Sequence, residues 1–248
     1  VCWAMGLTQH QNGVENIKEC VNLLLLKGSI GIKGGGTCPV RGHSNVQGDR
    51  TMGIDEKPPQ WLLDALEERF KFSVPREPGH NVVQAIQAME KGRAKVFIGM
   101  GGNFAQATPD TPRTHAALKQ CDLTVHVSTK LNRSHLITGK SALILPCLGR
   151  TEADIQGGQP QGVTVEDTFS MVHISYGQLP PGSALLRSEP AIVAGMAKAV
   201  LGNYPVDWDA LINDYSRIRE LIADTIPGFT GFNEKLSQPG GFHLPNPA

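Results

Sequence analysis

The stretch "AKVFIGMGGNFAQATPD", residues 94–110, decides the predicted fold. A short apolar run ends in two glycines and then turns polar, which is typical of a buried strand that leads into a loop. Two further apolar runs, "DLTVHVST" at residues 122–129 and "SALILPC" at residues 141–147, have the same character. The intervening "TPRTHAALKQC", residues 111–121, is a helical pattern with proline in its first turn. Short apolar strands that alternate with helices predict a parallel sheet.

Working outward, amphipathic or capped patterns predict helices on both sides of this region. They cover residues 12–28, 58–70, 81–91, 188–202 and 207–226, and the last is predicted as one continuous helix capped by Asp207. Residues 1–5 are predicted as a strand, residues 31–57 as a long glycine-rich loop, and residues 149–181 as short strands or extended arms. We predict a doubly wound, mainly parallel, Rossmann-like α/β sheet with helices on both faces.

Composition excludes several classes of protein. The formal net charge is zero and 40% of the residues are hydrophobic, so there is no electrostatic case for nucleic acid or an anionic membrane surface. No apolar run approaches the roughly 18 residues of a membrane span. The five cysteines are scattered and form no CxxC pair, which argues against zinc or iron–sulfur ligation within this chain. An odd cysteine count without a framework suits reduced thiols in a cytoplasmic protein.

Polar side chains follow three predicted strands and suggest a ligand site. They are Gln9 after the first strand, Asn103 after the "GMGGN" turn, and Ser128 with Thr129 after the next strand. In an open parallel sheet, ligands bind beyond the carboxyl ends of the strands. Ordinary turn chemistry explains any one of these sites, but three together favour a nucleotide-like ligand.

Other chemistry finds less support. No GxGxxG lies between a strand and a helix and no GxxxxGK[ST] exists, so neither NAD in its usual mode nor a P-loop is predicted. No GxSxG elbow appears. Glu152, Asp154, Glu166 and Asp167 could be acid–base groups, although clusters of this kind are usually solvated faces.

Four segments, taken together, resemble a known family. They are "WAMGLTQHQNG" (3–13), "LLLLKGSIGIKGGGTCPVRGHSNVQGDRTMG" (23–53), "FIGMGGNFAQATPD" (97–110) and "LILPCLGRTEAD" (143–154). In order and spacing they resemble the middle of a molybdopterin oxidoreductase of the dimethyl-sulfoxide-reductase family, formate dehydrogenase alpha-subunit type. The resemblance implies molybdenum held by two molybdopterin guanine dinucleotides, with an iron–sulfur cluster in an N-terminal part that this chain lacks.

The resemblance also implies how the chain is divided. Residues 1–57 would be the end of one α/β domain plus a glycine-rich active-site loop. Residues 58–236 would be an α/β molybdopterin-dinucleotide-binding domain, and residues 237–248 a linker towards a C-terminal domain. We expect a central fragment that is inactive alone, has no metal ligands of its own and binds no cofactor tightly without the rest of the protein.

The resemblance assigns the family's site positions to individual residues of this chain. The family's "MGxxQ" contacts map onto Met5 and Gln9, its asparagine after the next strand onto Asn103, and its small polar pair onto Ser128 and Thr129. The acidic residue that opens a later helix corresponds to Glu189. The chain departs from the family at Ala153, where relatives often carry lysine.

The segment "PVRGHSNVQG", residues 39–48, resembles the formate dehydrogenase loop whose arginine lies beside the substrate. The resemblance therefore implies catalytic roles for Arg41 and for His43, which replaces the family's glutamine. An arginine can hold a carboxylate with two parallel donors. The implied partners are a small anionic substrate such as formate, the remaining domains of the same chain, and, as a further partner, an electron-transfer subunit.

Two other readings stay open. One is a non-catalytic Rossmann-like module that binds another nucleotide at the strand ends. The other is the central α/β domain of a thiamine-diphosphate enzyme, against which the absence of a GDGx(n)NN metal motif argues.

Overall fold

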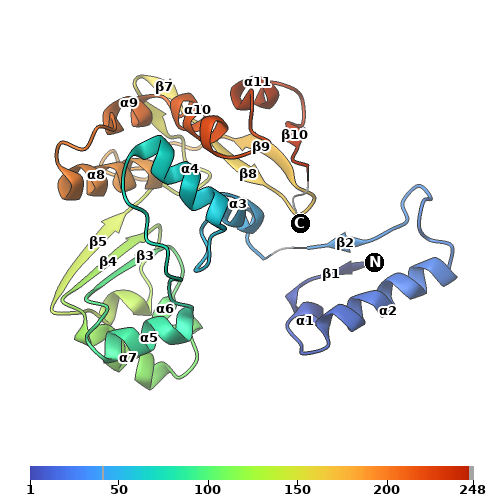
Figure 1. Ribbon diagram of the computed structural model, residues 1–248, viewed down its shortest axis with the longest axis horizontal. Helices are drawn as coiled ribbons and strands as arrows, with labels where there is room; N and C mark the ends of the chain where they lie inside the picture. Colours follow the sequence, from blue (N-terminus) through green and yellow to red (C-terminus); the bar gives the residue numbers. More distant parts are fainter. Residues whose placement is uncertain (41, 246–248) are drawn as a thin grey trace. The chain divides into compact units, whose positions relative to one another are not determined.

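The structure, a computed structural model, describes residues 1–40 and 42–245 (Figure 1). The chain forms two compact units. Unit 1 comprises Val1–Ile54, Thr164–Ile174 and Glu234–Ala248, and unit 2 comprises Asp55–Val163 and Ser175–Asn233. Each is described by itself. The predicted division at residues 57 and 236 stays a prediction.

Unit 2 is built on the three strands that the sequence predicted. They are β3 (Val96–Met100), β4 (Leu123–Ser128) and β5 (Ser141–Pro146), and they form a parallel sheet in the order β3-β4-β5. Phe97 pairs with Thr124 and Met100 with Val127, so strand neighbours share a face and alternate residues point to opposite faces. All three strands therefore end at the same edge of the sheet, as ligand binding at the carboxyl ends requires.

Helices cover both faces of this sheet. On the face that carries Phe97 lie α5 (Val82–Glu90), α6 (Phe104–Ala107) and α7 (Thr111–Gln120), which bury Ile86, Met89 and Leu118 in one cluster. On the opposite face, Val127 packs with Ile192 of α8 (Glu189–Leu201). The predicted α/β class with helices on both faces is confirmed.

The remaining elements of unit 2 include one correction. They are α4 (Gln60–Phe70), the 3-10 helix η1 (Arg133–Leu136), the hairpin β6 (Ile155–Gln156) and β7 (Gln159–Pro160), α9 (Trp208–Asn213) and α10 (Ser216–Thr225). The prediction of one continuous helix over residues 207–226 was wrong. Asp214 is extended (φ −150°, ψ 104°), and its carboxylate accepts the backbone N–H of Ser216 at 2.9 Å, so a second helix begins there.

Unit 1 starts with a parallel pair of very short strands, β1 (Cys2–Trp3) and β2 (Cys38–Pro39). Helices α1 (Met5–Thr8) and α2 (Gly13–Leu26) lie between them in the sequence. The predicted strand over residues 1–5 was too long, because Met5 already begins α1. The predicted loop over residues 31–57 contains β2 and also α3 (Val46–Thr51).

The other parts of unit 1 come from later in the chain. Strands β8 (Val163–Glu166), β9 (Met171–Ser175) and β10 (Phe242–His243) form a sheet in the order β10-β9-β8, and α11 (Phe232–Leu236) precedes β10. The Thr51 hydroxyl donates to the Glu166 carboxylate at 2.5 Å, and the Glu166 backbone N–H donates to Asn45 at 3.0 Å. Residues 45–51 are thereby fixed to a strand that lies more than a hundred residues away in the sequence.

Two histidines are buried beside the sheet of unit 2. His126 of β4 is 5% exposed and His135 of η1 is 8% exposed, and their ring centroids lie 4.9 Å apart. The Nε2 atom of each ring has no hydrogen-bond partner among the described residues. Burial, and then the neighbouring His135, hold the pKa of His126 below its ordinary value of 6.5. The folded protein therefore keeps His126 neutral at a pH where the unfolded chain takes up a proton.

We expect the stability of unit 2 to fall as the pH drops below about 6.5. The pKa of His126 is lower in the folded protein than in the unfolded chain, so the neutral side chain costs no stability above the unfolded pKa. Below that pH, protons bind preferentially to the unfolded chain, and the free energy of unfolding falls. Urea unfolding midpoints between about pH 7.5 and pH 5.5 measure the effect. His126→Gln should flatten the pH dependence, while His10→Gln, at an exposed position, should leave it unchanged. An unaltered slope in His126→Gln contradicts this assignment.

Candidate functional site

The carboxyl edge of the unit 2 sheet carries the residues predicted there. Asn103 follows β3 after two glycines, while Ser128 ends β4 and Thr129 follows it. The backbone N–H of Gly101 donates to the Val127 carbonyl at 2.7 Å, which holds the two strand ends side by side. Gly101 and Gly102 both have φ of +68°, a conformation that glycine adopts without strain, and they turn the chain at this edge.

Two of these side chains are already engaged. The Asn103 side-chain oxygen accepts the Ser134 hydroxyl at 2.9 Å, and the Ser128 hydroxyl donates to the Lys130 carbonyl at 2.7 Å. Thr129 is exposed and its side chain makes no hydrogen bond to residues 1–40 or 42–245. Of the three, Thr129 is the residue whose side chain has no hydrogen-bond partner among the described residues.

A pocket of about 380 Å³ opens beside this edge, within the size range of about 300–1,000 Å³ that small-molecule sites occupy. It joins the end of β4, the segment after β5, the start of β8 and the first turn of α8. Its polar lining comprises Thr129, Arg150, Glu152, Asp154, Gln161, Ser175, Ser188 and Glu189. The pocket therefore brings together two predicted residues, Thr129 and Glu189, that lie 60 positions apart in the sequence.

Glu152 fixes one rim of the pocket. Its carboxylate accepts the backbone N–H of Gly149 at 2.5 Å and that of Gly182 at 2.6 Å. These two N–H groups, Gly149 first, hold the pKa of the Glu152 carboxyl below its ordinary value. Gly177 packs against the Glu152 backbone so closely that no Cβ fits there. Glu152 therefore joins the loop at Gly149 to the loop at Gly182.

A buried hydroxyl network fixes the opposite wall. Tyr215 is 3% exposed, and its hydroxyl donates to the Asp154 carboxylate at 2.5 Å. The same oxygen lies 2.7 Å from the hydroxyl of Ser188, the residue that caps α8. Burial, followed by the Asp154 bond, raises the pKa of the Tyr215 hydroxyl. Tyr215 therefore stays protonated and ties the start of α8 to the segment that carries Asp154.

Sequence reasoning missed Tyr215, Ser188 and Gln161. Gln161 accepts the Tyr215 backbone N–H at 2.9 Å and so anchors the break between α9 and α10 at the pocket wall. The sequence held one usable signal, because "SEP" at residues 188–190 is a helix start with a capping serine. Nothing local indicated the partners of Tyr215, which lie 27 and 61 positions away.

The charges of the pocket favour a ligand that donates hydrogen bonds. Three carboxylates, those of Glu152, Asp154 and Glu189, face a single cation, Arg150. Backbone N–H groups already donate hydrogen bonds to the Glu152 carboxylate. The side chains of Tyr215 and Gln156 donate to the Asp154 carboxylate. Glu189 is exposed and its carboxylate has no hydrogen-bond partner among the described residues. It is the acceptor that remains for a ligand.

Unit 1 brings the other predicted residues to a second strand edge. Because β1 and β2 are parallel, Met5 and Gln9 follow one strand at the same edge where Val40, Gly42 and His43 follow the other. A methyl group added at Gly42 would lie 3.6 Å from Cε of Met5, and the Gln9 amide lies 3.8 Å from Sδ of Met5. His43 is exposed. Arg41 lies outside the described residues.

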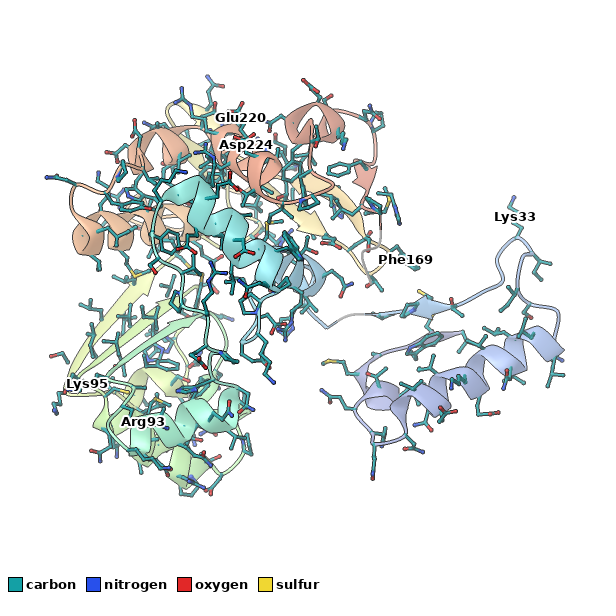
Figure 2. All side chains as sticks on the ribbon, viewed as in Figure 1. Lys33, Arg93, Lys95, Phe169, Glu220 and Asp224 are labelled. Atoms are coloured by element: carbon teal, nitrogen blue, oxygen red, sulfur yellow. The ribbon has the colours of Figure 1, made fainter. Side chains whose placement is uncertain are left out.

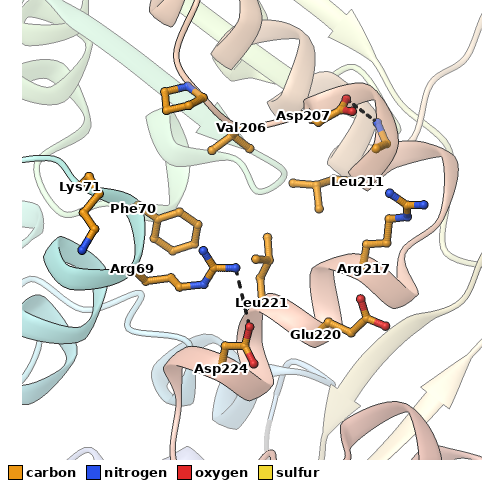
Figure 3. A pocket seen from close by; sticks show the side chains of 12 residues that line it. Arg69, Phe70, Lys71, Val206, Asp207, Leu211, Arg217, Glu220, Leu221 and Asp224 are labelled. Carbon is orange, nitrogen blue, oxygen red and sulfur yellow. Dashed lines mark hydrogen bonds and ion pairs between the residues drawn. The ribbon is translucent and has the colours of Figure 1, made fainter.

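A second pocket lies elsewhere in unit 2 and encloses about 480 Å³ (Figure 3). An ion pair of 3.7 Å joins Arg69 to Asp224, and the apolar lining comprises Phe70, Pro205, Val206, Ala210, Leu211 and Leu221. Its charged lining is balanced between Arg69, Lys71, Arg217 and Asp207, Glu220, Asp224. None of the predicted site residues lines it, so we take the smaller pocket beside the sheet as the candidate site.

Metal ligation has no candidate in this part of the protein. Within residues 1–40 and 42–245, no three or more His, Cys, Asp or Glu side chains gather as a metal site. Over the same residues, no helix has the length and apolar character needed to cross a bilayer.

Comparison with known proteins gives one family match. Residues 1–153 match the molybdopterin oxidoreductase family. An uncharacterized oxidoreductase of Mycobacterium tuberculosis (strain ATCC 25618 / H37Rv) is 56% identical over all 248 residues, which cover 32% of its own length. Protein YdeP of Escherichia coli (strain K12) is 52% identical, again over the whole chain and 33% of its length.

A more distant relative carries a more specific name. A Bacillus subtilis (strain 168) protein, YrhE, whose name assigns it provisionally as a formate dehydrogenase, is 29% identical over 165 residues, 62% of this chain and 16% of its own length. The chain thus spans about a third of the length of the curated relatives that match it throughout.

Proposed function

The chain belongs to the molybdopterin oxidoreductase family, and we propose that it forms the central cofactor-holding part of a formate dehydrogenase-like enzyme that uses molybdopterin guanine dinucleotide. The observation that carries this proposal is the pocket of unit 2. It lies at the carboxyl edge of a parallel sheet and offers one unused carboxylate, Glu189, beside one unused hydroxyl, Thr129.

The residues present fit the guanine end of such a dinucleotide. Guanine carries an N1–H and an N2 amino group on one edge, and a carboxylate accepts two parallel donors of this kind. Adenine lacks that pair of donors. An acceptor-rich pocket disfavours phosphate groups, so we assign the base and its ribose to Glu189 and Thr129. The phosphates would lie nearer the glycine turn at Gly101 and Gly102.

The substrate end is assigned to unit 1. We propose that Arg41 holds the carboxylate of a small anion such as formate and that His43 adds a titratable donor beside it. The packing of Met5 over Gly42 supports this assignment, because it brings the "MGLTQ" and "VRGHSN" segments together. We further propose that Met5, Gln9, Asn103 and Ser128 contact the pterin dinucleotides. The bound cofactor, with its molybdenum, supplies the two-electron redox chemistry, and this chain positions the reacting groups.

We also propose that further domains of the same protein cover part of unit 2. Val96, Ile98 and Met100 of β3 are 46–54% exposed, and Leu143 on the same face of β5 is 50% exposed. Parallel sheets are ordinarily buried on both faces. We propose that these domains include the part that carries the iron–sulfur cluster. We also propose that the enzyme works with an electron-transfer subunit and lies in the cytoplasm.

Replacing Glu189 by glutamine in the full-length protein should weaken retention of the guanine dinucleotide. The amide keeps the shape but presents a donor to the N1–H or N2 group, and leaving such a group unpaired costs about 1–3 kcal/mol, or roughly 5- to 150-fold in affinity. Release of GMP by acid hydrolysis of purified protein, quantified by mass spectrometry, measures the retained cofactor.

The matched control is Glu220→Gln, which changes another exposed glutamate of unit 2 in the second pocket. Equal GMP content in Glu189→Gln and Glu220→Gln would remove Glu189 from the base site. Recovery of an adenine nucleotide instead of GMP would favour the non-catalytic nucleotide-binding module.

A further inference from the structure

Cys2 and Cys38 lie opposite each other in the parallel pair of β1 and β2, although 35 residues separate them in the sequence. Residues in register on neighbouring strands point to the same face, and neighbouring strands lie about 4.7–4.9 Å apart. A disulfide needs a Cα–Cα separation of about 4.4–6.8 Å. The register therefore meets the backbone requirement for a bond between these two residues.

The thiol groups also contact each other. A hydrogen bond with the Cys2 side chain is the largest cause of a raised pKa at Cys38, followed by the charge that Cys2 carries when ionised. The two side chains are therefore close enough to interact, and the more exposed Cys2 is the thiol that a reagent in solution reaches first.

Both sulfurs are accessible in the part of the chain described. Cys2 is exposed and Cys38 is half-buried, whereas Cys121 before β4 and Cys147 after β5 are buried in unit 2. Burial raises the pKa of Cys121 and of Cys147, so these two thiols stay protonated and unreactive. Cys20 of α2 is half-buried and has no cysteine opposite it in a sheet.

We propose that Cys2 and Cys38 form a thiol pair that low-molecular-weight disulfides oxidise to an intramolecular disulfide. The Cys2 thiolate attacks one sulfur of a disulfide such as oxidised glutathione, forms a mixed disulfide and expels one thiolate, which takes up a proton. The Cys38 sulfur then loses its proton and attacks the Cys2 sulfur, and the second glutathione leaves as a thiol. The two cysteines lose two electrons and two protons, and the reagent disulfide becomes two thiols.

The bond closes the segment between β1 and β2. That segment contains α1, α2 and the glycine-rich turn whose tip carries Lys33 (Figure 2). The backbone N–H of Cys38 donates to the Val1 carbonyl and that of Val40 to the Trp3 carbonyl, and the Val1 amino group donates to the Gly36 carbonyl. So short a pairing opens easily, and a covalent bond would keep it closed.

Peptide mapping of the full-length protein tests the proposal. Native protein is treated with oxidised glutathione, free thiols are alkylated, and the digest is analysed by mass spectrometry without reduction. We expect a peptide pair linked through Cys2 and Cys38, while Cys20 carries a glutathione adduct or stays free. In Cys38→Ser the adduct at Cys2 should be at least about tenfold more abundant than in the wild type, because the intramolecular second step is lost.

Amide hydrogen exchange supplies a second readout. Oxidation should slow exchange over residues 36–40 in the wild type and leave it unchanged in Cys38→Ser. A Cys2 adduct of equal abundance in both proteins, or two sulfurs that remain unmodified, overturns the proposal.

Discussion

Tyr215→Phe is expected to lower the free energy of unfolding by about 2 kcal/mol, because it removes a buried hydroxyl that serves a carboxylate and a helix cap. The Asp154 oxygen that accepted this hydroxyl at 2.5 Å would lose its donor, and the Ser188 hydroxyl would lose its acceptor. Hydrogen bonds to charged groups contribute more than neutral ones, so this loss exceeds that of an ordinary surface tyrosine. Urea unfolding curves measure it.

The matched control is Tyr176→Phe, which removes the hydroxyl of a tyrosine that is 49% exposed. Tyr215→Phe should also release GMP from the full-length protein, because α8 and Asp154 form opposite sides of the proposed base pocket. Equal unfolding midpoints in the two variants would mean that the network does not hold the pocket together.

Arg41→Lys is expected to reduce kcat/KM for a carboxylate substrate about 10- to 100-fold in the full-length enzyme, with little change in the melting temperature. Lysine keeps the charge but loses the two-donor fork that matches a carboxylate. A loss of about 1.4–2.7 kcal/mol in transition-state binding corresponds to this range. Steady-state kinetics with formate, beside a melting curve, give the measurement.

Arg93→Lys is the control, since Arg93 is an exposed arginine before β3 (Figure 2). Wild-type kcat/KM in Arg41→Lys with an unchanged melting curve would leave Arg41 without a role in substrate binding. A parallel loss in Arg93→Lys would point to a general effect of lost guanidinium groups rather than to the substrate.

The sheet of unit 2 could be predicted from the sequence because each strand is a continuous apolar run. β3, β4 and β5 start within about two residues of their predicted positions, and the helices between them have their own caps and prolines. The break between α9 and α10 could not be predicted in the same way. The apolar period runs through Tyr215 without interruption, and contacts of Tyr215 with distant residues, beside the Asp214–Ser216 bond, fix the break at Asp214.

The residues of the candidate site also differ in whether a local signal or a long-range contact reveals them. Thr129 was indicated by its place after a predicted strand, whereas Glu189 was indicated only by the family resemblance. Glu152, Gln161 and Ser188 act through partners elsewhere in the chain, and the opposition of Cys2 and Cys38 depends on the register of two strands that a helix and a long turn separate. Local sequence patterns do not predict contacts between residues this far apart in the chain.

The discontinuity of unit 1 has a consequence for biosynthesis. Asn45 and Thr51 bond to Glu166, which lies 121 and 115 positions later. At a synthesis rate of about 5–20 residues per second, the ribosome reaches Glu166 roughly 6–24 s after it has made these partners.

During that interval the first 54 residues lack the strands that complete their unit, while most of unit 2 is being translated. Helix α2 would remain an exposed apolar segment of the nascent chain. Three of its leucines are exposed even in the folded structure, namely Leu23, Leu25 and Leu26. We expect chaperones that recognise apolar segments to bind this region while it is exposed on the nascent chain. Ribosome profiling of chaperone-bound nascent chains should show occupancy that begins after α2 emerges and ends once residues 164–174 have left the exit tunnel.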